Sequence, residues 1–418
     1  MSAAPAVPAV PAVPAYRGIT WDHPRGRDAL RAAAAADAAI DLSWNAHSLE
    51  HFESHPIDEL ARDYDLIVLD HPHLGEALEH GSLRPMHEVV GEELLERWAE
   101  ASVGPSFESY RLRGRQWALP LDAATQVAVL RRDLLDGRVP ETWADVERLA
   151  TEAPVALSLA GPHAFLSFVS ICVALGEPVA DHPQPSAAGP SRPLVSEITG
   201  ALALDILRSI GSRAPAGSET WNPIALLERM TGTDEIAYCP LVYGYVTYSS
   251  PVLRFADAPS ALPGGRRGST IGGTGIAVSR RAEITPQLVA HIVGLLSEGS
   301  QRGFIPEHAG QPSARSAWTD EAVDRASAGF YRSTLATVES SWVRPRYAGY
   351  IAFQSAASAL VREVVAGVLP VAEGLARLDS AFHASVRSSP AATDAVGGPV
   401  AATFDRTRAV PLTEGATS

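Results

Sequence analysis

Two short stretches concentrate side chains that can move protons or contact a ligand. The first reads Trp-Asp-His-Pro-Arg over positions 21–25, and the second reads Asp-His-Pro-His over positions 70–73. A carboxylate that orients an imidazole forms a general acid-base pair, so Asp22 with His23, or Asp70 with His71, can supply one. The same groups can ligate a divalent metal. The purely structural alternative makes Trp21 a core residue and Asp22 a helix cap.

Both stretches follow a predicted strand. A short β-type run at 16–20 precedes the first, with helix-favouring residues at 28–39 after it. The second lies at the end of the predicted strand 63–70, whose apolar run is near-continuous. Alternating strands and helices predict a parallel sheet with right-handed crossovers. The turns after its first and third strands are neighbours at the edge where ligands bind. We therefore expect the Asp-His pairs of the two stretches to lie close together.

Further candidate ligand contacts are spread along the chain. Aromatic side chains at turns can stack on a sugar ring. Backbone N–H groups of the glycine-rich stretch 268–275 can hold an anion, and arginines can clamp a carboxylate or phosphate. Core packing and close turns are the alternative interpretation of each. The candidates are Trp21, Trp44, Trp221, Tyr243, Gly273 and Arg344.

Several familiar site patterns do not occur. The glycine-rich stretch lacks the Lys-Ser/Thr ending of a nucleotide loop and the spacing of a dinucleotide fingerprint. The chain has no Gly-x-Ser-x-Gly elbow and no cysteine pair with zinc spacing. We therefore predict no cofactor and no metal site.

Length and composition set the broad class. The 418 residues are 46% hydrophobic and 20% charged, which is typical of a soluble globular protein with room for two domains. The formal net charge of −14 argues against nucleic acid or an anionic membrane as partner. No apolar run is long enough to span a membrane. The two cysteines, Cys172 and Cys239, lie in apolar sequence and are predicted to be buried thiols.

The two ends differ from the rest of the chain. Residues 1–15 repeat Pro-Ala-Val without the basic segment of a secretory signal, and they predict an extended, disordered leader. This leader favours a cytoplasmic location. Residues 387–418 are rich in Ser, Pro, Ala and Gly and predict a loose tail.

The order of several motifs resembles that of the family 1 extracellular solute-binding proteins of ABC sugar importers. The resemblance covers about residues 16–385. It rests on Asp-Leu-Ile-Val-Leu-Asp at 65–70, Trp-Ala-Leu-Pro-Leu-Asp at 117–122 with Gln126, Pro-Glu-Thr-Trp-Ala-Asp-Val at 140–146, Ile-Gly-Gly-Thr-Gly-Ile-Ala-Val-Ser at 271–279, Gly-Gln-Pro at 310–312, and Arg-Pro-Arg at 344–346 with Tyr350.

The resemblance implies an α/β fold of the periplasmic-binding-protein type. Two lobes, each with a mainly parallel sheet flanked by helices, are joined by a hinge and close over a ligand. Lobe 1 comprises 16–121 with part of 250–315, and lobe 2 comprises 122–249 with part of 316–386, which returns to it or to the hinge. Asp122 is then expected near the hinge, and Asp122 and Gln126 join the ligand-binding candidates.

The function implied is binding of a small molecule, a carbohydrate or a small carboxylate, in the cleft between the lobes. The missing secretion signal and lipid-anchor cysteine argue against an ABC permease as partner. The alternative is a cytoplasmic isomerase, lyase or hydrolase built on the same fold. In that enzyme His23 or His71 would move the proton, and Asp22 or Asp70 would orient the imidazole.

Overall fold

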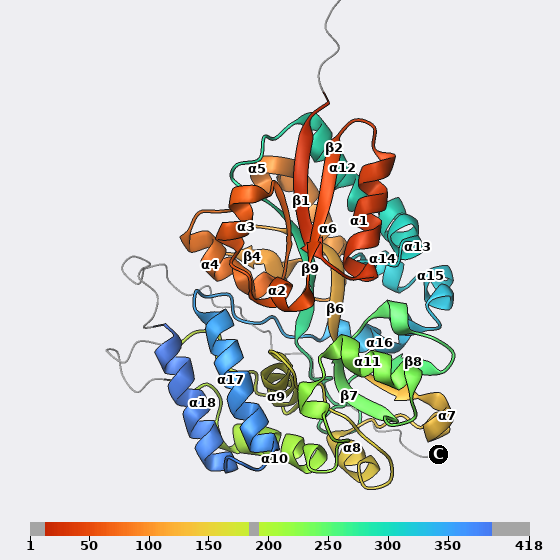
Figure 1. Ribbon diagram of the computed structural model, residues 1–418, viewed down its shortest axis with the longest axis vertical. Helices are drawn as coiled ribbons and strands as arrows, with labels where there is room; N and C mark the ends of the chain where they lie inside the picture. Colours follow the sequence, from red (N-terminus) through yellow and green to blue (C-terminus); the bar gives the residue numbers. More distant parts are fainter. Residues whose placement is uncertain (1–12, 184–191, 387–418) are drawn as a thin grey trace, which may run out of the picture.

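The computed structural model describes residues 13–183 and 192–386 (Figure 1). The predicted tail 387–418 and residues 1–12 of the predicted leader lie outside this range. The chain folds into two lobes, one above the other in Figure 1. We call the upper lobe, which holds the first strand, lobe 1, and the lower lobe 2.

Lobe 1 is built on three parallel strands. These are β1 (Ala15–Trp21), β2 (Asp41–His47) and β3 (Leu66–Leu69), with β1 between the other two. β9 (Ile271–Val278) pairs antiparallel with β3 and reaches this sheet from far along the chain. The four strands place the ends of β1 and β3 at the edge that faces lobe 2.

The helices of lobe 1 cover this sheet on both sides (Figure 1). Seven of the described helices around it are only one or two turns long, and a small antiparallel pair, β4 (Arg111–Leu112) and β5 (Arg115–Gln116), lies beside them. The helices are α1 (Pro24–Ala36), α2 (Leu49–Ser54), α3 (Ile57–Asp63), α4 (Leu74–Glu79), α5 (His87–Val90), α6 (Glu92–Ala101), α12 (Pro286–Leu295), α13 (Ile305–Glu307), α14 (Arg315–Trp318) and α15 (Glu321–Ala326).

One strand belongs to both lobes. β6 (Leu119–Arg131) is 13 residues long and buried throughout. Its first half, up to Thr125, pairs with β9 of lobe 1, whereas from Gln126 onward it pairs with β7 (Tyr238–Tyr243) and β8 (Leu253–Ala256) of lobe 2. The first of the backbone connections between the lobes is therefore an unbroken strand rather than a loop.

Lobe 2 is mainly helical around these short strands. Its central helix, α9 (His163–Ala174), is buried at every position, which explains why its sequence is apolar all round. α17 (Tyr350–Val365) and α10 (Glu197–Gly211) pack against it, and α18 (Val371–Ser385) packs on both of them. The other helices are α7 (Arg132–Leu135), α8 (Trp143–Leu149), α11 (Pro223–Gly232) and α16 (Phe330–Glu339).

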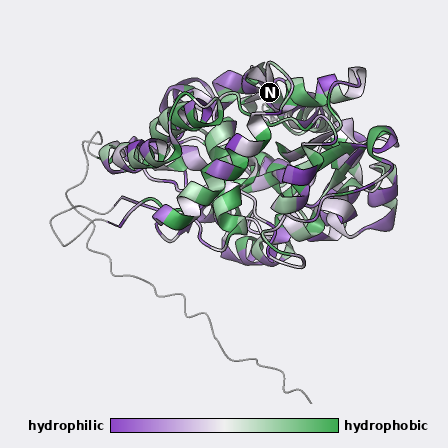
Figure 2. Ribbon diagram, turned by 90° about the horizontal axis from the view of Figure 1, so that it is seen from below, coloured by the Kyte–Doolittle hydropathy of each residue, from purple (hydrophilic) through white to green (hydrophobic). Residues whose placement is uncertain are grey.

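Figure 2 shows helices of the outer layer that change between hydrophobic and hydrophilic along their length. This is the pattern of helices with one face on a core and one face in water. Within the described ranges, no helix combines the length and apolar content that a bilayer crossing demands.

The start of the chain differs from the sequence-based prediction in two details. α1 begins at Pro24, before the predicted start at 28, because proline fits the first turn of a helix. His23, not Asp22, caps this helix, and its Nδ1 accepts from the backbone N–H of Arg25 at 3.2 Å.

The pairing of the strands also differs along the sheet. Parallel pairing is confined to β2, β1 and β3, since every ladder of β9, β6, β7 and β8 is antiparallel.

Candidate functional site

A cavity of about 60 Å³ lies where the ends of β1 and β3 face lobe 2. Its walls combine aromatic rings with charged groups, and both lobes contribute. Lobe 1 supplies Trp21, Arg25, Phe52, Glu53, Asp70 and Thr274, and lobe 2 supplies His163, Pro223, Tyr243 and Tyr245. Each of the two predicted polar turns thus supplies side chains to one cavity, Trp21 and Arg25 from the first and Asp70 from the second.

Arg25 ties the cavity wall to β6 and to lobe 2. Its Nε donates to Asp122 Oδ2 at 2.8 Å, and its Nη1 donates to the carbonyl oxygen of Gly244 at 3.1 Å. The guanidinium also lies 4.8 Å from the ring centroid of Tyr245, in cation–π contact. Asp122 accepts a second hydrogen bond from the Thr274 N–H at 2.6 Å. The Arg25–Asp122 pair is buried, so each charge depends on the other for compensation.

Asp70, at the end of β3, pairs with Arg344. Arg344 also donates to the carbonyl oxygen of Ile271 at 3.3 Å and to Gln354 Oε1 at 3.4 Å. Burial alone would raise the pKa of Asp70, but the Arg344 guanidinium holds it well below its usual range. Asp70 is therefore a permanent carboxylate that already has a cationic partner.

Aromatic side chains form one side of the cavity. Trp21 lies 5.9 Å from Phe52 and 5.8 Å from Tyr245 between ring centroids, the second in an edge-to-face arrangement. Tyr243 lines the cavity too, and its hydroxyl lies 3.1 Å from Thr270 Oγ1. Rings in these positions can pack against the C–H faces of a sugar or polyol.

Glu53 and His163 meet from opposite lobes across the cavity. Glu53 Oε1 lies 3.4 Å from His163 Nε2. His163 is only 3% exposed, and neither of its ring nitrogens has a hydrogen-bond partner among the described residues. A donor or acceptor on a ligand would therefore meet polar atoms that the protein itself leaves unsatisfied.

The histidines and carboxylate expected to do chemistry lie outside this cavity. Asp22 is exposed and pairs with Arg27 on the surface. His23 stacks on Trp21 at 5.1 Å, and burial lowers its pKa to about 4. His71 is fully buried next to Tyr110, and burial lowers its pKa to about 4 as well. Both histidines are thus neutral bases without access to a ligand in the cavity.

Three other candidates lie elsewhere or act indirectly. Trp44 packs in the core of lobe 1 directly over Gly18, and Trp221 packs in a core of lobe 2 with Arg229 against its ring at 4.6 Å. Gln126 sits in the middle of β6, where its Oε1 accepts from Ser170 at 2.7 Å. These side chains hold the scaffold of the site and do not line it.

Gly273 does line the cavity, and its backbone requires glycine. Its φ is +94°, and a Cβ there would lie 2.6 Å from the carbonyl oxygen of Asp122. The glycine-rich stretch is therefore a close approach of β9 to β6. No group of three His, Cys, Asp or Glu side chains that could hold a metal ion is found in residues 13–183 and 192–386.

The sequence-based prediction did not include Glu53, His163 or Phe52 among the ligand contacts. Glu53 and Phe52 belong to a short, mostly polar helix, α2, that carries no motif. His163 follows a Gly-Pro turn after an apolar run, which was the same strand-to-turn signal used for the other two stretches. This strand-to-turn pattern could have identified His163 as a candidate ligand contact, but by itself it predicted only a turn.

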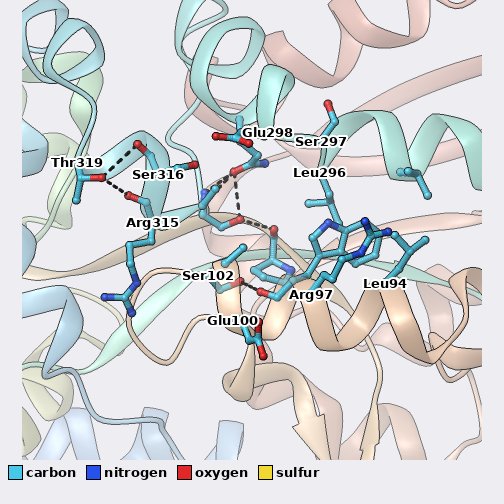
Figure 3. Close-up of a pocket in the computed structure, with 17 residues that line it drawn as sticks. Leu94, Arg97, Glu100, Ser102, Leu296, Ser297, Glu298, Arg315, Ser316 and Thr319 are labelled. Atoms are coloured by element: carbon cyan, nitrogen blue, oxygen red, sulfur yellow. Dashed lines mark hydrogen bonds between the residues drawn. The ribbon is translucent and has the colours of Figure 1, made fainter.

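A larger cavity, of about 660 Å³, lies in lobe 1 between α6, α12 and α14 (Figure 3). Its hydroxyls bond within the protein: Ser102 Oγ donates to the carbonyl oxygen of Trp98, and Ser313 Oγ donates to that of Pro120. Gln301 Oε1 already accepts from Ser313 and Ala314. Because these polar groups are satisfied, we place the candidate site in the smaller cavity between the lobes.

No family model matches the chain, and no curated protein matches it. Solved structures do match, and they show the fold, which is that of the sugar-type solute-binding proteins of ABC transporters. The α/β fold of the periplasmic-binding-protein type, predicted from the sequence, is confirmed.

Three of these structures illustrate the likeness. The maltose-bound MalE3 protein of T. maritima is 16% identical, with 88% of this chain and 99% of that chain covered and a TM-score of 0.72. A solute-binding protein of Agrobacterium radiobacter in complex with ribitol is 19% identical, with 88% and 98% covered and a TM-score of 0.71. The GacH receptor of Streptomyces glaucescens is 13% identical, with 90% and 99% covered and a TM-score of 0.73.

Proposed function

We propose that the protein binds a small carbohydrate or polyol between its two lobes. The observation that carries the proposal is the cavity itself, in which aromatic rings of Trp21 and Tyr243 stand beside the polar groups of Glu53 and His163. Rings bind the C–H faces of a sugar, and charged oxygen or nitrogen atoms bind its hydroxyls. The structural neighbours solved with maltose and with ribitol support the same class of ligand.

Binding further requires the lobes to separate. A cavity of about 60 Å³ is well below the several hundred Å³ of sites for small organic ligands. We propose that β6 is the hinge, with its pivot near Gln126, where its partner changes from β9 to β7 and β8. Opening there would part Glu53 from His163 and Arg25 from Gly244, and closure over a ligand would restore these contacts.

The test is a thermal-shift and calorimetry screen of neutral mono- and disaccharides and polyols. A ligand at about a hundred times its dissociation constant raises the stability by roughly 2.7 kcal/mol, which such a screen detects. The absence of any binder at millimolar concentration would contradict the proposal.

Two tyrosines of β7 provide a matched pair of variants. Tyr243 lines the cavity, whereas Tyr238 is fully buried in the core of lobe 2. Tyr243→Leu should weaken the affinity about two- to tenfold, because a stacked ring contributes roughly 0.5–1.5 kcal/mol. Tyr238→Leu should lower stability and leave the affinity of the folded protein unchanged. Equal effects of the two variants on affinity would argue against binding in this cavity.

We propose no enzymatic reaction, since neither His23 nor His71 lines the cavity. The cytoplasmic location stays a prediction of the leader sequence. Cell fractionation with N-terminal sequencing checks it, with residues 1–15 expected intact in the cytoplasmic fraction. Recovery of secreted or membrane-held protein without them would instead favour an ABC permease as partner.

A further inference from the structure

Arg25, which lines the cavity, and Arg344, which lies behind the lining residue Asp70, are each paired with a carboxylate. Arg25 pairs with Asp122 and also donates to Gly244. Arg344 pairs with Asp70, and each of its three nitrogens has a hydrogen-bond acceptor. The charge of each guanidinium is therefore already compensated by a carboxylate of the protein, and neither arginine offers an unpaired positive charge to an anionic ligand.

Glu53 is in a different situation. Among the described residues that line the cavity, Glu53 and Asp70 are the two carboxylates, and only Asp70 has an arginine partner. The group nearest to Glu53 is His163, at 3.4 Å, which compensates the carboxylate only when its imidazole is protonated. The uncompensated charge at the cavity is therefore negative.

We propose that Glu53 is the specificity-determining residue of this site, and that the site selects neutral or amine-bearing polyhydroxy ligands over those that carry a carboxylate or phosphate. This inference rests on the proposed function and narrows its ligand class. It assigns no ligand role to the arginines that the sequence had suggested for binding a small carboxylate.

Two interactions produce the selection. A ligand hydroxyl or ammonium donates to Glu53 in a charge-assisted hydrogen bond, which is stronger than a neutral one. An acidic group in the same place meets a like charge at close range, at a carboxylate whose side chain is 24% exposed, and the two repel each other. His163, whose nitrogens have no other partner, can hydrogen-bond a second hydroxyl from the opposite lobe.

The experiment compares matched ligand pairs by calorimetry. The pairs are ribitol with ribonate, mannitol with mannonate, glucose with gluconate and maltose with maltobionate; glucosamine is added as the amine. Titrations at pH 8 lie well above the reference pKa of histidine, about 6.5. The variants are Glu53→Gln, which removes the charge and keeps the hydrogen-bonding shape, and the control Glu50→Gln, an exposed residue of the same helix.

We expect the wild type and the Glu50→Gln control to bind the neutral member of a pair at least tenfold more tightly than its acid. Glucosamine should bind at least as tightly as glucose. Glu53→Gln should reduce the neutral-to-acid ratio at least tenfold and remove any advantage of glucosamine.

The outcomes separate the two proposals. If no neutral ligand binds the wild type, the proposed function fails, and this inference fails with it. If neutral ligands bind but the acids bind equally well, or if Glu53→Gln leaves the ratio unchanged, the assignment of Glu53 is overturned while carbohydrate binding stands.

Discussion

The buried Arg25–Asp122 pair makes a quantitative prediction about stability. Arg25→Met removes the guanidinium but keeps much of the aliphatic stem, so Asp122 is left as a buried carboxylate. Its remaining partner is the Thr274 N–H at 2.6 Å. Breaking a buried pair by removing one partner destabilises a protein by about 3–5 kcal/mol. The surviving hydrogen bond places the expected loss near the lower end, at about 3 kcal/mol.

A surface pair of the same length provides the control. Arg208 and Asp205 of α10 are also 2.8 Å apart, but their side chains are about half exposed, whereas those of Arg25 and Asp122 are 4% and 6% exposed. Exposed pairs contribute about 0–1 kcal/mol. Arg208→Met should therefore change the free energy of unfolding by less than about 1 kcal/mol.

The assay is equilibrium unfolding in urea of the single variants and of the double variant Arg25→Met/Asp122→Asn. The double variant has no buried unpaired charge, so it should be more stable than the sum of the two single losses predicts, by at least about 2 kcal/mol. Losses that simply add, or a loss for Arg25→Met no larger than for Arg208→Met, would refute the argument from burial.

Two further predictions concern pH and close packing. Burial lowers the pKa of both His71 and His73 to about 4, so the unfolded chain takes up protons that the folded chain does not, and stability falls as the pH drops from about 6.5 toward 4. At pH 5 the loss of stability is about 2 kcal/mol for each histidine. Melting curves at pH 7 and pH 5 should therefore show a smaller shift in Tm for the double variant His71→Asn/His73→Gln than for the wild type. An equal shift in the two proteins would contradict this account. Gly268→Ala should destabilise by about 2 kcal/mol, because its Cβ would lie 2.1 Å from the carbonyl oxygen of Ser170. Gly232→Ala, where no atom lies within 4 Å of the new Cβ, should be neutral or stabilising in the same urea titration, and matching losses would show that packing at Gly268 is not the cause.

The sequence predicted the strands at the cavity better than the direction of the side chains after them. β3 was recognisable because a strand buried on both faces is continuously apolar. Asp70 and His71 follow it at adjacent positions, and only Asp70 lines the cavity, while His71 is sealed in the core. Side chains at adjacent positions leave the backbone in different directions, and a run of polar residues in the sequence does not show which of them faces the ligand.

Local sequence patterns could not predict the contacts between the lobes. Glu53 and His163 are 110 positions apart, and each looks ordinary in its own segment. From the sequence alone Arg344 was a candidate for binding an anion, but folding brings Asp70 against it from 274 positions away. Long-range pairing of charges therefore decided the chemistry of the cavity.

The interleaving of the two lobes has a consequence for synthesis on the ribosome. In lobe 1, β9 lies between β3 and β6, yet residues 271–278 leave the ribosome after both strands of lobe 2, β7 and β8. Until then β3 and the first half of β6 lack the strand that joins them. The first 270 residues cannot complete the lobe that begins the chain, so the nascent protein must carry an unfinished sheet edge through about half of its translation, from the end of β3 to the start of β9. A nascent chain with this topology is a natural client for factors that shield unpaired strands until the missing one arrives.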